Sequence, residues 1–219
     1  MHYMRIIALL LLCPLSLLRA ADTAVAATAA PPTLATLAEF AAWLRPLAAV
    51  RSVQAEYRQT RLLRSLNFSL SIHGHMAQEQ GRRLLWATTS PMRSTCIFSE
   101  DSFQQWDAET GKVTSLSAAD MPWLKVLFNC QKQWLSGDLD ALATDFSIEP
   151  LDDHTLRLTP RRQEFQLFFT QIEMRFRPSY DAIARLVFSE KNGDSMQMDF
   201  FNIRNNEPIP EQLWMLPPK

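Results

Sequence analysis

The chain has 219 residues, 47% of them hydrophobic, and its 22 basic and 23 acidic residues leave a formal net charge of −1. This balance excludes the basic field that attracts nucleic acid, and it argues against strong attraction to anionic lipid surfaces. Only five glycines are present, which disfavours the Gly-rich loops that hold nucleotides.

The first residues have the pattern of a secretory signal peptide. A positively charged start precedes an apolar run over residues 6–18 and an Ala-rich tract. The apolar run is shorter than the roughly 20 residues that a membrane-spanning helix needs. We therefore expect residues 1–26 to be a leader cleaved after Ala20 or Ala26. Residues 27–219 are then one exported domain, long enough to bury a real core.

Two cysteines remain after such a cleavage, Cys96 and Cys130. In an oxidising compartment an isolated pair is more often bonded than free. A disulfide between them is predicted, and it would contribute roughly 3–4 kcal/mol in the chain-entropy model. The alternative is a pair of buried thiols.

The first half of the chain changes from helical to strand periodicity. Thr33 precedes a stripe of apolar residues at helical spacing, which predicts a helix over residues 34–44. From Val53 onward apolar and polar residues alternate, which indicates half-buried strands. The clearest alternation places Phe68, Leu70 and Ile72 on one face. Shorter strands are expected at residues 84–88, 94–99, 103–107 and 112–116.

A helical segment interrupts the strands. Pro122 suits a first helical turn, and an apolar stripe follows it, consisting of Trp123, Leu124, Leu127 and Phe128. Gly137 and Asp138 precede a second short helix over residues 139–143. We expect the first of these helices to act as a lid on the sheet.

Strands resume in the second half, at residues 146–151, 156–159, 172–176, 182–188 and 196–200. Alternation is strict around Met174 and Phe176, and Asn192-Gly193 is a strong hairpin signal. The sequence therefore predicts about ten strands with one apolar face each. A sheet of that size must curl or be covered.

The simplest architecture is mainly β: a curved antiparallel sheet whose concave apolar side is covered by the few helices. Incomplete filling of that interior would leave a ligand cavity. The alternating strands are expected to line it through Phe68, Leu70, Ile72, Met174, Phe176, Met196, Met198 and Phe200, with Trp86 and Trp106 as additions.

No motif for chemistry stands out. The sequence has no G-x-S-x-G, no H-E-x-x-H, no P-loop and no C-x-x-C. His73 and His75 lie two apart on one strand, but two ligands on a polar strand face are usually surface residues. We therefore expect no catalytic residue, no metal and no cofactor, and a binding protein rather than an enzyme.

The order and spacing of several short motifs resemble the LolA-type periplasmic lipoprotein carriers. Leu37 followed by residues 53–59 is similar to the opening of that family. The remaining matches are Gly74, Leu84-Leu85-Trp86, Ser90-Pro91, Gln105-Trp106-Asp107, Gly111-Lys112-Val113, residues 137–146, 156–160, 172–176 and 183–188, Asn192-Gly193-Asp194 and residues 200–206.

The resemblance implies an unclosed β half-barrel with a helical lid that binds acyl chains without a metal or cofactor. Members of this carrier family take lipoproteins from an inner-membrane transporter to an outer-membrane acceptor. The expected partners are therefore lipoprotein acyl chains or another lipid, together with those two membrane proteins. The expected location is the periplasm, and the expected state is a monomer.

One departure from the family bears on the cargo. The carriers typically have an Arg-Pro turn after the glycine, and its arginine is thought to latch the lid. Here the turn reads Glu79-Gln80-Gly81, followed by Arg82 and Arg83. The run over residues 59–66 also resembles a divergent LolA-like branch. A lipid or lipoprotein carrier and a non-transporting sensing or regulatory module on the same fold both remain open.

Overall fold

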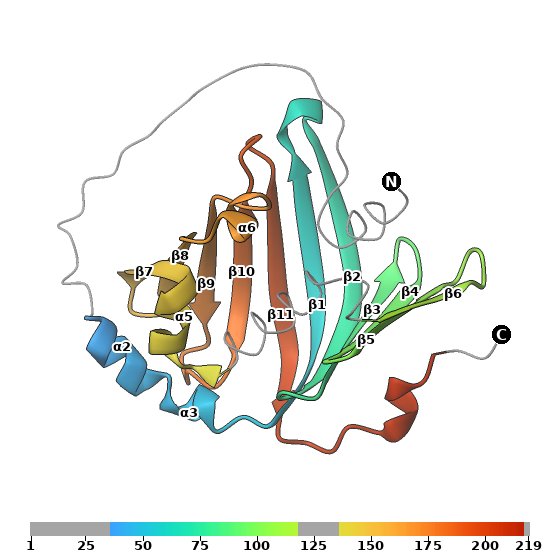
Figure 1. The fold of residues 1–219 in the computed structure, drawn as a ribbon, viewed down its shortest axis with the longest axis horizontal. Coiled ribbons are helices and arrows are strands. Elements are labelled where there is room, and N and C mark those ends of the chain that lie inside the picture. The colour runs from blue at the N-terminus through green and yellow to red at the C-terminus, as the bar shows by residue number, and fades with distance from the viewer. Residues whose placement is uncertain (1–35, 118–135, 217–219) are drawn as a thin grey trace.

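A computed structural model of the protein describes residues 36–117 and 136–216, which form one antiparallel sheet with short helices (Figure 1). The 11 strands lie in the order β6-β5-β4-β3-β2-β1-β11-β10-β9-β8-β7. Their bounds are β1 Ser52–Leu63, β2 Phe68–Glu79, β3 Arg83–Ser90, β4 Ser94–Ser99, β5 Ser102–Asp107, β6 Val113–Ser117, β7 Phe146–Asp152, β8 Thr155–Pro160, β9 Gln171–Phe176, β10 Ile183–Ser189 and β11 Ser195–Asn205. The predicted curved, antiparallel and unclosed sheet is confirmed.

The longest strands form the centre of the sheet. β1 pairs with β2 along its whole length and with β11 on its other side. β2 continues through hairpins into β3–β6, and β11 is followed across the sheet by β10–β7. The two halves of the sheet are therefore joined by β1 and β11, which come from opposite ends of the chain.

The first helix begins at Thr36, because Thr36 and Glu39 form a capping box in which each side chain accepts a backbone N–H of the other residue. The expected helix over 34–44 is thus α2, Leu37–Trp43, and Leu44 separates it from α3, Arg45–Ala48. Phe40 and Leu47 anchor the two helices in the core.

Two further helices contact the β7–β8 end of the sheet. α5, Leu139–Asp145, matches the predicted short helix and is capped by Asp138. α6, Gln163–Gln166, was not expected from the sequence. Leu142 and Phe165 are buried in the same core as the sheet residues Leu158 and Ile172. These helices therefore cover the part of the inner face that lies toward β7 (Figure 1).

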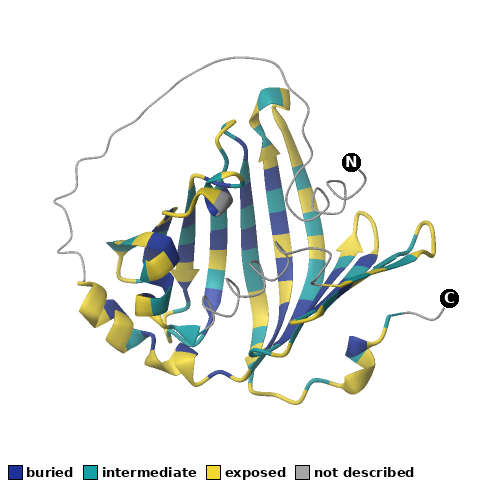
Figure 2. Ribbon diagram, in the orientation of Figure 1, coloured by how far each residue is buried: buried dark blue, intermediate teal, exposed yellow. Residues whose placement is uncertain are grey.

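Burial alternates along the strands, as period-two geometry requires (Figure 2). One face carries the main hydrophobic core, and we call it the inner face. Met174, Met196 and Met198 belong to it, with exposures of 0%, 3% and 7%. The opposite, outer face is mostly polar along β9–β11.

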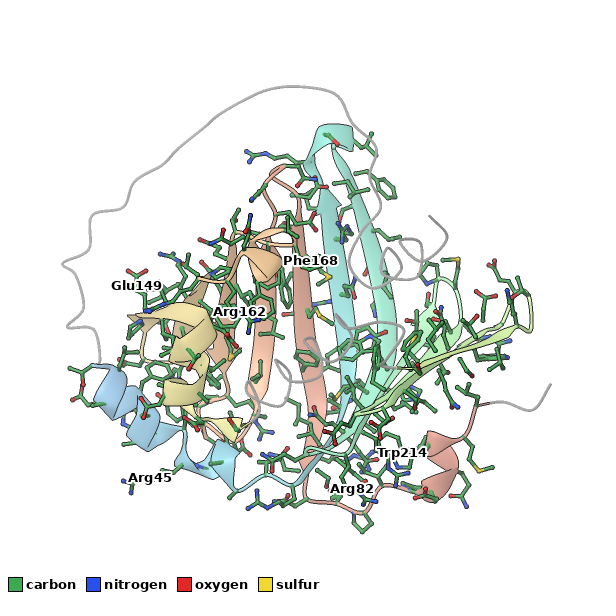
Figure 3. All side chains as sticks on the ribbon, in the orientation of Figure 1. Arg45, Arg82, Glu149, Arg162, Phe168 and Trp214 are labelled. Atoms are coloured by element: carbon green, nitrogen blue, oxygen red, sulfur yellow. The ribbon has the colours of Figure 1, made fainter. Side chains whose placement is uncertain are left out.

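A second, smaller core lies on the outer face of β2–β4. Its sheet residues are Ala77, Leu85, Ala87 and Ile97, and Trp214 covers them from η2, Glu211–Trp214. No helix is predicted from the sequence at residues 211–214, yet this segment covers the outer face of β2–β4. Figure 3 shows Trp214 and Arg82 at the same corner of the molecule.

Arg83 belongs to this outer cluster. Its guanidinium lies 4.3 Å from the ring centroid of Trp214 and forms ion pairs with Glu79 and Glu211 at 3.0 and 2.7 Å. Arg82 is exposed and pairs with Glu79. Arg83 shares its face with Leu85 and Ala87, because the three alternate along β3. It therefore lies on the outer face of the sheet, opposite the main core.

Candidate functional site

The inner face is a mainly apolar surface that runs across the strands from β8 to β2. Strand register places one row of directly paired residues through its middle: Leu156, Met174, Leu186, Met198, Gln59 and Ile72. A neighbouring row, nearer the β1–β2 turn, consists of Leu158, Ile172, Phe188, Met196, Arg61 and Leu70. Most side chains in both rows are apolar, and the methionines Met174, Met196 and Met198 are the flexible ones.

Aromatic rings continue this surface toward β3. The ring centroids of Tyr57 and Trp86 are 4.6 Å apart, and Phe200 meets Trp86 edge-on at 6.2 Å. Tyr57 is fully buried, and its hydroxyl lies 2.9 Å from that of Thr88. Burial raises the pKa of Tyr57 to about 12.

Gly74 makes the close packing of Tyr57 possible. A Cβ at this position would lie 2.0 Å from the carbonyl oxygen of Ala87 and 2.6 Å from the Tyr57 hydroxyl. Since Tyr57 and Gly74 are directly paired on neighbouring strands, the ring lies over the space that a side chain would fill. Only glycine fits this position.

Most of the predicted lining residues share the inner face. Trp86, Met174, Phe176, Met196 and Met198 are buried in its core. Ile72 and Phe200 are partly buried against the same core. Leu70 and Phe68 lie on this face by register, and Phe68 is 50% exposed at the end of the sheet. Whether these residues contact a ligand stays a prediction.

The placement of Trp106 on this surface is wrong. Trp106 pairs with Thr95, which pairs with Ala87 of the outer cluster. Phe103 of β5 lies on the inner face, where its ring packs on that of Phe98 with the ring centroids 4.9 Å apart. Residues 103 and 106 have opposite parity, so a strand must direct them to opposite faces.

The predicted disulfide is not formed in the structure. Cys96 is a buried free thiol on the inner face, paired with Trp86 across the strands. Burial raises the pKa of this thiol to about 12, so it is a weak nucleophile. Cys130 lies outside the described residues, as do the predicted lid residues Trp123, Leu124, Leu127 and Phe128.

Two buried polar residues on the inner face were missed by sequence reasoning. Gln59 and Arg61 are 4% and 6% exposed, and they continue the alternation of Val53, Ala55 and Tyr57 along β1. The signal was therefore available: the parity that buries Tyr57 also buries positions 59 and 61.

The described residues contain no group of three or more His, Cys, Asp or Glu side chains that could hold a metal ion. His73 and His75 lie on the outer face, where burial lowers the pKa of His75. No described helix is both long enough and apolar enough to cross a membrane.

Comparison with known families assigns the fold. The family model described as outer membrane lipoprotein carrier protein LolA matches residues 48–216, a span that contains every described strand. The chain belongs to the LolA family. None of the curated proteins compared with it matches.

The chain is also similar to several solved structures. An uncharacterized conserved protein from Thermus thermophilus aligns with a TM-score of 0.51 and 11% identity, covering 83% of this chain and 95% of that one. A LolA superfamily protein from Nitrosomonas europaea aligns with a TM-score of 0.42 and 9% identity, covering 80% of this chain and 96% of that one. A chain of the Pseudomonas aeruginosa MucA/MucB complex aligns with a TM-score of 0.47 and 13% identity, covering 80% of this chain and 60% of that one. The Thermus match supports the fold alone.

Proposed function

We propose that this LolA-family protein is a periplasmic carrier that binds the acyl chains of a lipoprotein or another lipid on its inner face and moves them toward the outer membrane. Family membership and the predicted signal peptide support the location and the role. An inner-membrane donor and an outer-membrane acceptor are the partners that such a role requires. The carrier needs neither a cofactor nor a catalytic group.

The mainly apolar rows from β8 to β2 carry this proposal. Exposing an acyl chain to water costs roughly 0.8 kcal/mol per methylene, so a lipid needs an apolar surface to cross an aqueous compartment. The described α-helices contact mainly β7 and β8, at one end of the sheet. The β1–β6 half is where we expect the helix around Trp123–Phe128 to close over cargo.

Methionine makes this surface adaptable. Met76, Met174, Met196 and Met198 all belong to the inner core. Their unbranched side chains can change rotamer to follow a chain of different length or branching. Such a surface shields acyl chains without requiring specific hydrogen bonds from them.

The chain offers a matched pair of variants for the test. Phe200 and Phe201 are neighbours on β11, but Phe200 contacts Trp86 on the inner face and Phe201 is 40% exposed on the outer face. We expect Phe200→Gln to weaken binding of a dansyl-labelled fatty acid about tenfold, since a lost phenyl contact is worth about 1.4 kcal/mol or more. Phe201→Gln should leave the affinity unchanged.

Mass spectrometry of lipid that co-purifies after gentle extraction is the second measurement. Lipid should accompany the wild type and Phe201→Gln, and less should accompany Phe200→Gln. Equal binding by both variants would place the site elsewhere. A protein that binds no acyl probe and retains no lipid would refute the carrier proposal.

A further inference from the structure

A single ion pair interrupts the apolar rows of the inner face that the structure describes. Arg61 lies between Leu70 and Met196 in its row, and the next residue beyond Met196 is Phe188. The side chain of Arg61 is only 8% exposed, and its Nη2 donates to Oε1 of Glu190 at 2.7 Å. Glu190 is 9% exposed and follows β10 in the turn to β11.

Stability does not explain this pair. Removing two charges from water costs about as much as their attraction returns, and apolar residues of similar size often replace such pairs without loss. Every neighbour of Arg61 in its row is apolar, so a methionine or leucine would fit the pattern better. A role for this charge in binding a ligand would explain why it is kept within an apolar row.

Glu190 is a poorly stabilised partner for Arg61. Burial raises the pKa of its carboxyl group, an effect that the positive Arg61 opposes and the nearby Asp194 reinforces. Asp194 itself is satisfied by the Arg64 backbone N–H at 2.8 Å and the Asn192 side-chain amide at 2.9 Å. Among these groups, the Arg61 guanidinium is the one whose planar fork suits a phosphate or a carboxylate.

The position of the pair suits the head of an amphiphile. Arg61 lies near the β1–β2 turn, where Leu66 and Phe68 are 46% and 50% exposed. From Arg61 the same face of β1 runs to Tyr57 over about 14 Å, at roughly 3.4 Å per residue. A headgroup at Arg61 would therefore lie at the end of the sheet, with its chain extending over Met198 toward the aromatic rings.

We propose that Arg61 binds the anionic group of an acyl lipid, a phosphate or a carboxylate, and that Glu190 occupies the guanidinium when no lipid is bound. This inference rests on the proposed acyl-binding function and adds the charge class of the ligand. Binding exchanges one ion pair for another, so the lipid is selected by its charge as well as by its chain.

The test compares three amphiphiles that share a myristoyl chain and therefore have roughly equal apolar transfer energies: lysophosphatidylglycerol, myristate and neutral monomyristoylglycerol. Affinities are measured by titration calorimetry on the full mature protein. We expect the wild type to bind at least one of the two anionic lipids about tenfold more tightly than the neutral one, which is the usual scale of a charge-assisted hydrogen bond. The preferred anion identifies the group as phosphate or carboxylate.

Variants then assign the preference to Arg61. Arg61→Met should lower the anionic affinity about tenfold and change the neutral affinity less than about threefold. Glu190→Gln, which removes the competing charge, should strengthen anionic binding. The matched control is Arg58→Met, because Arg58 is on the same strand but 54% exposed on the outer face; its preference should equal that of the wild type.

Arg61→Met leaves Glu190 buried without its ion-pair partner, so the double variant Arg61→Met/Glu190→Gln protects the test against misfolding. It should fold, bind the neutral lipid and show no charge preference. Wild-type binding of all three lipids with equal affinity would overturn the headgroup assignment while the acyl carrier stands. If none of the three binds, the proposed function fails as well.

Discussion

Substitution of Gly74 by alanine tests how tightly the centre of the inner face is built. The added Cβ would lie 2.0 Å from a backbone oxygen, that of Ala87, and 2.6 Å from the Tyr57 hydroxyl. The backbone of Ala87 is held between β2 and β4 by its strand pairings, so it cannot move away without breaking them. The ring of Tyr57 must move as well.

The expected loss of stability in Gly74→Ala has three parts. Overpacking a close contact costs about 1–3 kcal/mol. Displacing Tyr57 loses its hydrogen bond to Thr88, worth about 1 kcal/mol. Its ring contact with Trp86 is worth about 1 kcal/mol more. Gly74→Ala should therefore destabilise the protein by about 3–5 kcal/mol, a large part of the stability of a typical domain.

Urea denaturation followed by tryptophan fluorescence measures this loss. With a slope of about 2 kcal/mol per molar urea, the midpoint should fall by about 1.5–2.5 M. Gly111→Ala is the matched control, because its Cβ would meet nothing within 4 Å and only the positive φ of 65° is strained. That variant should lose about 1 kcal/mol. The packing argument is refuted if the two variants lose the same stability.

Three further predictions concern stability. The pKa of Tyr57 is raised to about 12, so burial of its neutral hydroxyl contributes fully to the free energy of unfolding below pH 10. This contribution is lost as pH rises toward 12, at up to about 1.4 kcal/mol per pH unit. Urea titrations at rising pH should show this slope in the wild type but not in Tyr57→Phe, and equal slopes would contradict the burial argument. Trp214→Ala should cost about 3 kcal/mol, at the low end for a buried tryptophan because its cluster is small, and should speed proteolysis near residue 208; an unchanged cleavage rate would mean that Trp214 does not hold the C-terminal segment. Thr36→Ala removes the cap of α2 and should cost about 1 kcal/mol by the same denaturation assay, whereas Thr36→Ser should cost little.

Strand geometry made much of this fold predictable. The alternation of Met196, Met198 and Phe200 assigns them to one face wherever their strand is placed, because successive side chains point to opposite sides. The same geometry explains the error at Trp106. The prediction adds Trp106 to the inward-facing residues, although the parity of β5 directs Phe103 inward and Trp106 outward.

Long-range pairing was not predictable in the same way. Arg61 and Glu190 are 129 positions apart, and only the placement of β1 beside β11 brings the two side chains together. Trp214 likewise covers Leu85 because the chain returns to the outer side of β3 after its last strand. No local pattern around Glu190 or Trp214 indicates these partners.

The sequence by itself determined the approximate number of strands and the face on which most apolar residues lie, since both depend on backbone geometry over a few residues. The tertiary structure decided which strands are neighbours, that the outer face has a core of its own, and that a buried charge pair lies within the apolar surface. These depend on the total burial that the whole chain achieves. That sum is shared among residues far apart in sequence, so it cannot be assigned to any one segment.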